Sequence, residues 1–109
     1  MEFPEEEWIK FKAKIFKALG NPIRLKIIRF LAEGEKCVCE IFPHVDQTQP
    51  AVSRHLQILK DCGIIKFRKD GNRHLYSLTD PQIVDVLESV DADLTKALSQ
   101  RLISQMTPL

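Results

Sequence analysis

Hydrophobic and polar residues recur with the period of an amphipathic α-helix in four long stretches of this chain. These stretches are residues 5–19, residues 22–33, the segment from Asp46 to Gly63, and residues 81–105. A shorter apolar segment, residues 37–43, predicts one or two further helical turns that end at its proline. Two short helices joined by a tight turn between residues 37 and 63 predict a helix-turn-helix.

The segment from Asp46 to Gly63 contains the helix on which the remaining interpretation depends. Thr48 is a favourable N-cap, Pro50 is tolerated in the first turn, and Gly63 is expected to end the helix. One face is apolar and carries Val52, Leu56 and Leu59. The opposite face carries hydrogen-bonding and cationic side chains, namely Gln49, Ser53, Arg54, Gln57 and Lys60. Such groups can reach base edges and phosphates, although an ordinary amphipathic surface helix has the same pattern.

Beyond this helix the hydrophobic period changes to two, which predicts a β-hairpin over residues 64–79. Asp70-Gly71-Asn72 supplies the turn, and basic residues flank it. A basic hairpin directly after such a helix predicts a winged helix-turn-helix, an α+β fold that is mainly α with one small hairpin. The helix-turn-helix would span about residues 37–63.

The return strand of this hairpin does not alternate perfectly. Tyr76 and Leu78 can share its inner face. Leu75 then falls on the outer face, where an apolar side chain is not expected.

The last stretch, residues 81–105, predicts one continuous helix capped by Asp80. Its apolar stripe would run for about 38 Å, whereas a domain of this size is only about 30 Å across. We therefore expect a second copy of the chain to cover it, so that the first helix (residues 5–19) and the last helix form a dimer interface. The alternative is a helix wrapped on its own core.

Length and charge refine this picture. With 109 residues, the chain is expected to form a single domain over residues 1–109. The net charge is only +1, but six basic residues oppose two acidic ones between Thr48 and Tyr76. From Asp80 onward, five acidic residues oppose two basic ones. A basic middle beside an acidic tail favours one anionic partner, and a solvated charged face is the alternative.

Several functional classes have no support in the sequence. There is no signal-peptide pattern and no run of about 18 apolar residues, so we expect a cytoplasmic protein without membrane contact. In that compartment the three cysteines are expected to be thiols or metal ligands. The three histidines have no motif spacing and no glycine-rich phosphate loop is present, so an enzyme is not expected.

Taken together, the order and spacing of five motifs resemble the arsenical-resistance repressor (ArsR/SmtB) family of metal-sensing winged-helix repressors. The resemblance covers about residues 10–98. The motifs are Ala18-Leu19-Gly20-Asn21-Pro22-Ile23-Arg24-Leu25, Cys37-Val38-Cys39-Glu40, Ser53-Arg54-His55-Leu56 with Leu59, Gly63-Ile64-Ile65, and Gly71-Asn72-Arg73 with Leu75-Tyr76. The resemblance implies a homodimer that binds operator DNA without metal and releases it when an inducer binds.

The resemblance also implies which residues contact DNA. Base and groove contacts fall on the helix within the segment from Asp46 to Gly63, at Thr48, Gln49, Ser53, Arg54 and His55. His55 can instead be a packed histidine at the junction of helix and wing. Phosphate attraction is expected from the hairpin, at Lys66, Arg68, Lys69 and Arg73.

Cys37 and Cys39 are the candidate sensor site. On a regular helix residues two apart point about 200° apart, so chelation by both requires the start of the short helix to distort. Because that helix should pack on the helix that contacts DNA, the distortion would displace the DNA-contacting face and cause release of the DNA. The resemblance assigns this pair to members that sense As(III), Sb(III), Cd(II) or Pb(II), as an inducer and not an obligatory cofactor.

A third ligand is less well defined. Soft metalloids prefer three thiolates, and Cys62 is the remaining cysteine, although it can equally be a small apolar residue at a helix end. Glu40 and His44 are lesser candidates.

Two other functions compete with metal sensing. A redox or persulfide sensor could use the same cysteines, but a disulfide between residues two apart is expected to be strained. A winged helix can also serve as a protein-interaction module, against which the basic helix and hairpin argue.

Overall fold

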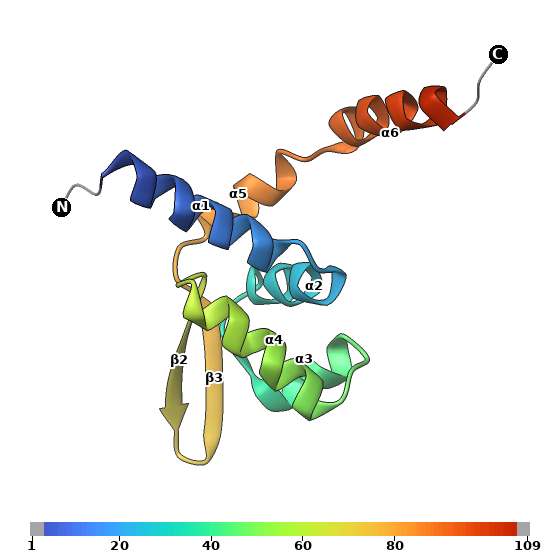
Figure 1. Cartoon of the computed structure of the whole chain (residues 1–109). Helices are drawn as coiled ribbons and strands as arrows, with labels where there is room; N and C mark the ends of the chain where they lie inside the picture. Colours follow the sequence, from blue (N-terminus) through green and yellow to red (C-terminus); the bar gives the residue numbers. More distant parts are fainter. Residues whose placement is uncertain (1–3, 107–109) are drawn as a thin grey trace.

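The structure, a computed structural model, describes residues 4–106, and its elements follow the predicted order closely (Figure 1). The elements are α1 (Glu5–Leu19), α2 (Pro22–Leu31), β1 (Lys36–Cys37), α3 (Val38–His44), α4 (Gln49–Asp61), β2 (Ile65–Asp70), β3 (Arg73–Leu78), α5 (Gln82–Glu88) and α6 (Ala92–Met106). Helices α3 and α4 form the helix-turn-helix, and the hairpin β2–β3 forms the wing beside α4. This is a winged helix-turn-helix fold.

Local hydrogen bonds explain where two helices begin. The Asn21 side chain accepts hydrogen bonds from the N–H groups of Ile23 and Arg24, and so caps α2. The Thr48 hydroxyl accepts a hydrogen bond of 3.3 Å from the Ala51 N–H and caps α4 as predicted. At Gly63 the backbone enters the left-handed region, with φ of 79°, just after α4 ends.

The core lies between α2, α3 and α4. The apolar stripe of α4 faces inward, since Val52, Leu56 and Leu59 are all at most 1% exposed. They pack in one cluster with Ile27 and Ile28 of α2 and with buried residues of the other elements. Burial of these side chains fixes which face of α4 remains on the surface.

The wing is more than the predicted hairpin. The short strand β1 pairs antiparallel with β3, which gives a three-stranded sheet in the order β1-β3-β2. Leu75 lies opposite Cys37 of β1 and is only 5% exposed. The expectation that Leu75 faces solvent is therefore wrong, because a third strand and the adjacent α3 cover that part of β3.

The last helix is also different from the prediction. The continuous helix over residues 81–105 is interrupted at Ser89–Asp91 and divides into α5 and α6. The Asp91 carboxylate accepts a hydrogen bond of 2.8 Å from the Leu94 N–H, which starts a new helix at that point. An aspartate that caps an N-terminus competes with continuation of the preceding helix, and the apolar periodicity does not register this competition.

Helix α6 extends away from the rest of the molecule (Figure 1), and it contains no buried residue within the part that the structure describes. Its apolar residues Leu98 and Leu102 are 61% and 58% exposed. Of the predicted last helix, only the α5 part contacts the core, through Ile83 and Leu87, so the alternative of a helix wrapped on its own core is not observed for α6. None of the helices within residues 4–106 has the length and apolar character needed to cross a membrane.

Two neighbouring residues of α4 provide a matched test of this core. Leu59 is fully buried, whereas Ile58 is 42% exposed. We expect Leu59→Ala to lower the free energy of unfolding by about 2–5 kcal/mol, and Ile58→Ala to lower it by less than about 1 kcal/mol. Urea unfolding at one fixed protein concentration measures both, and equal losses would contradict the packing described here.

Candidate functional site

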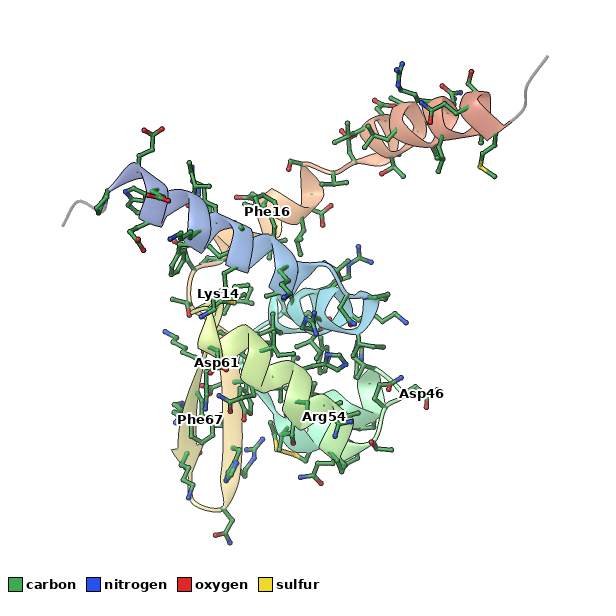
Figure 2. All side chains as sticks on the ribbon, viewed as in Figure 1. Lys14, Phe16, Asp46, Arg54, Asp61 and Phe67 are labelled. Atoms are coloured by element: carbon green, nitrogen blue, oxygen red, sulfur yellow. A yellow bond between two sulfur atoms is a disulfide. The ribbon has the colours of Figure 1, made fainter. Side chains whose placement is uncertain are left out.

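The exposed face of α4 carries the polar residues that were predicted to contact DNA. Gln49, Ser53 and Arg54 are exposed, and Arg54 lies on the outer surface of the helix-turn-helix (Figure 2). Thr48 is also exposed, although its hydroxyl is engaged in capping α4. The structure therefore brings these four side chains together along the first two turns of one helix.

His55 occupies a different position from its neighbours, because it is half-buried against α2. Its Nδ1 atom lies 3.0 Å from the Arg24 Nη1 atom. Arginine only donates hydrogen bonds, so Nδ1 must be the acceptor and the imidazole must be neutral with its proton on Nε2. Burial, together with the charges of Arg24 and Arg54, lowers the pKa of His55. His55 is thus a packed histidine, which was the alternative to a DNA contact. If His55 also contacts DNA, only its Nε2 atom is available to do so.

Arg24 also holds the end of α1. Its Nε atom donates a hydrogen bond of 2.5 Å to the carbonyl oxygen of Ala18, near the carboxyl end of that helix. Cations are favourable at a helix C-terminus, where carbonyl groups lack partners. Arg24 thus joins α1, α2 and α4 at one point, a role that sequence reasoning did not assign to it.

Two further contacts fix the carboxyl end of α4. Lys14 of α1 lies near Asp61 (Figure 2) and donates a hydrogen bond of 3.3 Å to its carbonyl oxygen. The Lys60 ammonium lies 5.4 Å from the centre of the Phe67 ring in the wing, within the range of a cation–π interaction. These contacts set the position of α4 relative to both α1 and the wing.

The four basic residues predicted on the hairpin are all exposed, but two of them are paired with carboxylates. Arg68 forms a bidentate pair with Glu35, with N–O distances of 2.7 and 2.8 Å. The hydrogen bond from Arg68 lowers the pKa of Glu35, and the same bond raises that of Arg68. Arg73 has its Nη2 atom 3.7 Å from Glu40 Oε1. Lys66 and Lys69 complete the basic surface.

Sequence reasoning missed Glu35, and it considered Glu40 only as a metal ligand. Glu35 and Glu40 flank the strand β1, and this strand has only two residues, so the sequence shows no periodicity that would predict it. Only its pairing with β3 brings residues 35–40 beside the wing.

Cys37 and Cys39 lie at the junction between β1 and α3. Cys37 has an extended backbone, with φ of −71° and ψ of 147°, and it is the N-cap residue of α3. Its sulfur accepts a hydrogen bond of 3.1 Å from the Cys39 N–H. The two sulfurs are joined in a disulfide, with 5.1 Å between the Cα atoms (Figure 2). Cys37 is buried, whereas Cys39 is exposed.

This geometry corrects the expectation that the two sulfurs diverge. That expectation assumed that both residues lie within a helix, but α3 begins only at Val38. The extended backbone of Cys37 turns its side chain toward Cys39, so the sulfurs converge while α3 stays helical. The first turn of α3 therefore does not need to unwind for both sulfurs to reach one ligand.

Cys62 lies elsewhere in the molecule. It is 5% exposed at the carboxyl end of α4, and its thiol donates a hydrogen bond of 3.4 Å to the Leu59 carbonyl oxygen. His44 is stacked on Phe30, with 3.7 Å between the ring centres. Over residues 4–106, no group of three or more histidine, cysteine, aspartate or glutamate side chains could hold a metal ion. The described part of one chain thus brings together two sulfurs and no third ligand.

Comparison with known proteins identifies related sequences. The family described as "Bacterial regulatory protein, arsR family" matches residues 21–66. An HTH-type transcriptional regulator of Methanocaldococcus jannaschii is 45% identical over 80 residues, which cover 72% of this chain and 90% of that protein. The arsenical resistance operon repressor of Staphylococcus aureus is 35% identical over 71% of this chain and 74% of the repressor. A cadmium resistance regulatory protein of the same species, a CadC homolog, is 42% identical over 70% of this chain and 64% of that protein.

Solved structures share the fold. Rv0081 from Mycobacterium tuberculosis has a TM-score of 0.74 and 32% identity, covering 87% of this chain and 96% of that one. The homodimeric winged helix-turn-helix DNA-binding domain Mb0332 from Mycobacterium bovis has a TM-score of 0.77 and 26% identity, covering 92% and 93% of the two chains.

The contact between Arg24 and His55 predicts a pH dependence of stability. Because the pKa of His55 is lower in the folded chain than its ordinary value of about 6.5, the unfolded chain binds protons more readily at mildly acidic pH. The stabilisation is complete above about pH 6.5 and is lost as the pH falls through the folded-state pKa. Urea unfolding between pH 8 and pH 5 should show a smaller loss for His55→Gln than for the wild type. Equal losses of stability in the two proteins would show that protonation of His55 does not cause the pH dependence.

Proposed function

The chain belongs to the ArsR family of bacterial regulatory proteins, and we propose that it is a homodimeric, thiol-dependent transcriptional repressor that releases its operator when a soft metal or metalloid ion binds Cys37 and Cys39. Membership in this family makes it a DNA-binding transcriptional regulator and not an enzyme. The observation that carries the proposal is the convergence of two cysteine sulfurs at the start of α3, within the helix-turn-helix.

Operator binding is proposed to use α4 and the wing. A helix of this width fits the major groove, where the side chains of Gln49, Ser53 and Arg54 would meet base edges. Thr48 and the Nε2 atom of His55 would contribute at the margins of this contact. The basic residues of the wing would meet phosphates, and these are Lys66, Arg68, Lys69 and Arg73. A repressor with these partners would act in the cytoplasm.

The ion is proposed to be As(III), Sb(III), Cd(II) or Pb(II). Thiolate sulfur is a soft ligand that favours such ions, and the two sulfurs can approach one ion without unwinding α3. Related proteins are named for arsenical and cadmium resistance, which supports this range of ions. Cys62 is not proposed as a ligand in the same chain, because its thiol is buried in the core.

The dimer is proposed to form through α1 and the last two helices. Phe11 and Phe16 of α1 are 47% and 64% exposed, and Val90, which follows α5, is 59% exposed. Together with the apolar residues of α6, they make an apolar surface that one chain leaves in water. The homodimeric state of the Mycobacterium bovis domain supports a second copy as its cover.

The disulfide favours one second candidate, a redox-sensing repressor on the same fold. In that mechanism the thiols of Cys37 and Cys39 lose two protons and two electrons to form one S–S bond. An oxidant of the peroxide class would accept the two electrons and two protons, and its O–O bond would break to give two waters, or one alcohol and one water from an alkyl hydroperoxide.

Cysteine substitutions test the proposal and separate it from this alternative. Using operator DNA selected from random duplexes, we expect the double variant Cys37→Ser/Cys39→Ser to bind like the reduced wild type but to lose release by arsenite or cadmium. Cys62→Ala should respond as the wild type does. Fluorescence anisotropy follows release, and thiolate–metal absorption follows binding in the same samples. Release by peroxide and not by metals would favour the redox sensor, and a normal metal response of the double variant would refute the site.

The wing contacts predict a particular salt dependence. Lys69→Ala should lower the slope of log affinity against log salt concentration by about one per protomer, for operator and random duplexes alike. Lys96→Ala in α6 serves as the control of equal charge change and should leave the slope unchanged. A slope that Lys69→Ala does not alter would remove the wing tip from the DNA interface.

A further inference from the structure

Two acidic residues on either side of Cys37 each hold an arginine of the wing. Glu35 precedes β1 and binds Arg68 of β2 through two hydrogen bonds of 2.7 and 2.8 Å. Glu40 lies in the first turn of α3, and its Oε1 atom is 3.7 Å from Arg73 Nη2 of β3. The wing arginines are thus paired by residues that belong to the segment of the candidate sensor.

Glu40 has a second contact within this segment. Its Oε1 atom accepts a hydrogen bond of 3.0 Å from the Cys37 N–H, while the Cys37 sulfur accepts one from the Cys39 N–H. Cys37 as the N-cap residue and Glu40 as the third helical residue also form a capping box, in which the side chain of each contacts the backbone of the other. The same carboxylate oxygen therefore contacts the backbone of Cys37 and faces Arg73.

The sheet adds a third connection. Cys37 pairs with Leu75, and Leu75 also pairs with Arg68 of β2. Residues directly opposite in antiparallel strands share one face, so Cys37, Leu75 and Arg68 lie side by side on the same face of the sheet. A displacement of the backbone at Cys37 is therefore expected to shift β3, the strand that carries Arg73.

We propose that Glu35 and Glu40 are positioning residues that withhold Arg68 and Arg73 from DNA phosphate when the sulfurs of Cys37 and Cys39 are held together. The structure has the sulfurs joined and both arginines facing carboxylates. Phosphate and carboxylate bind the guanidinium fork in the same way, so the two compete for it. With the sulfurs apart, the capping box loosens and the arginines become available to the duplex. This inference rests on the proposed function, and it assigns release to the wing instead of α4.

Glutamine substitutions isolate the charge in this mechanism. Glutamine at position 40 can still complete a capping box, so Glu40→Gln keeps the fold of the junction but removes the anion that faces Arg73. Glu35→Gln removes the anion that binds Arg68. Glu33→Gln is the matched control, because it makes the same charge change in the same segment but pairs with Lys36, 3.6 Å away.

The experiment measures operator affinity of the full chain with and without cadmium, with thiolate–metal absorption as the second readout. In the wild type we expect cadmium to weaken binding by about 5- to 150-fold. The double variant Glu35→Gln/Glu40→Gln should bind cadmium with the same stoichiometry and absorption, yet its operator affinity should fall less than 2-fold. Without cadmium, in the reduced chain whose sulfurs are apart, the arginines are already available, so each single variant should bind the operator within about 2-fold of the wild type. Glu33→Gln should behave as the wild type in both states.

The outcomes separate this inference from the proposed function. If cadmium binds the double variant and releases the operator as fully as it does from the wild type, the positioning role is wrong while the sensor remains. If the wild type itself neither binds cadmium through thiolates nor releases DNA, the proposed function fails, and the link to the wing fails with it.

Discussion

The backbone hydrogen bonding of Cys37 is the constraint on which the candidate site depends. This residue ends β1, where it pairs with Leu75, and it caps the first turn of α3. Its N–H is held by Glu40, and its extended backbone turns its sulfur toward Cys39. Strand pairing and helix capping both require directional hydrogen bonds, so a displacement at this residue must be shared with the wing or with α3.

Helix α4 is held more firmly than the wing. Its inner face is buried against α2 and α3, Arg24 fixes His55 near its middle, and Lys14 fixes its carboxyl end. The wing, by contrast, projects from the molecule, and the residues toward its tip, 66–70 and 73–74, are exposed. A modest change at the cysteines is therefore expected to alter the wing more easily than α4, because fewer packing contacts oppose it.

Family membership determines the fold and the class of function, but not the signal to which the protein responds. Relatives of similar identity are named for cadmium and for arsenical resistance. Because they share one fold, selectivity must come from a few ligating side chains and their neighbours. The ligands proposed for this chain are the two sulfurs of Cys37 and Cys39, while Cys62 contributes to the core.

The sequence by itself determined the helix-turn-helix and the hairpin, because helical and strand periods and the Thr48 cap are local properties. Tertiary structure decided the rest. A two-residue strand has no period, so only its pairing with β3 could bury Leu75 and bring Glu35 to Arg68. The cap at Asp91 divided a helix whose apolar stripe continues across the break. The sulfurs of Cys37 and Cys39 converge because one lies in a strand and the other in a helix, and that boundary is set by contacts with residues nearly forty positions away.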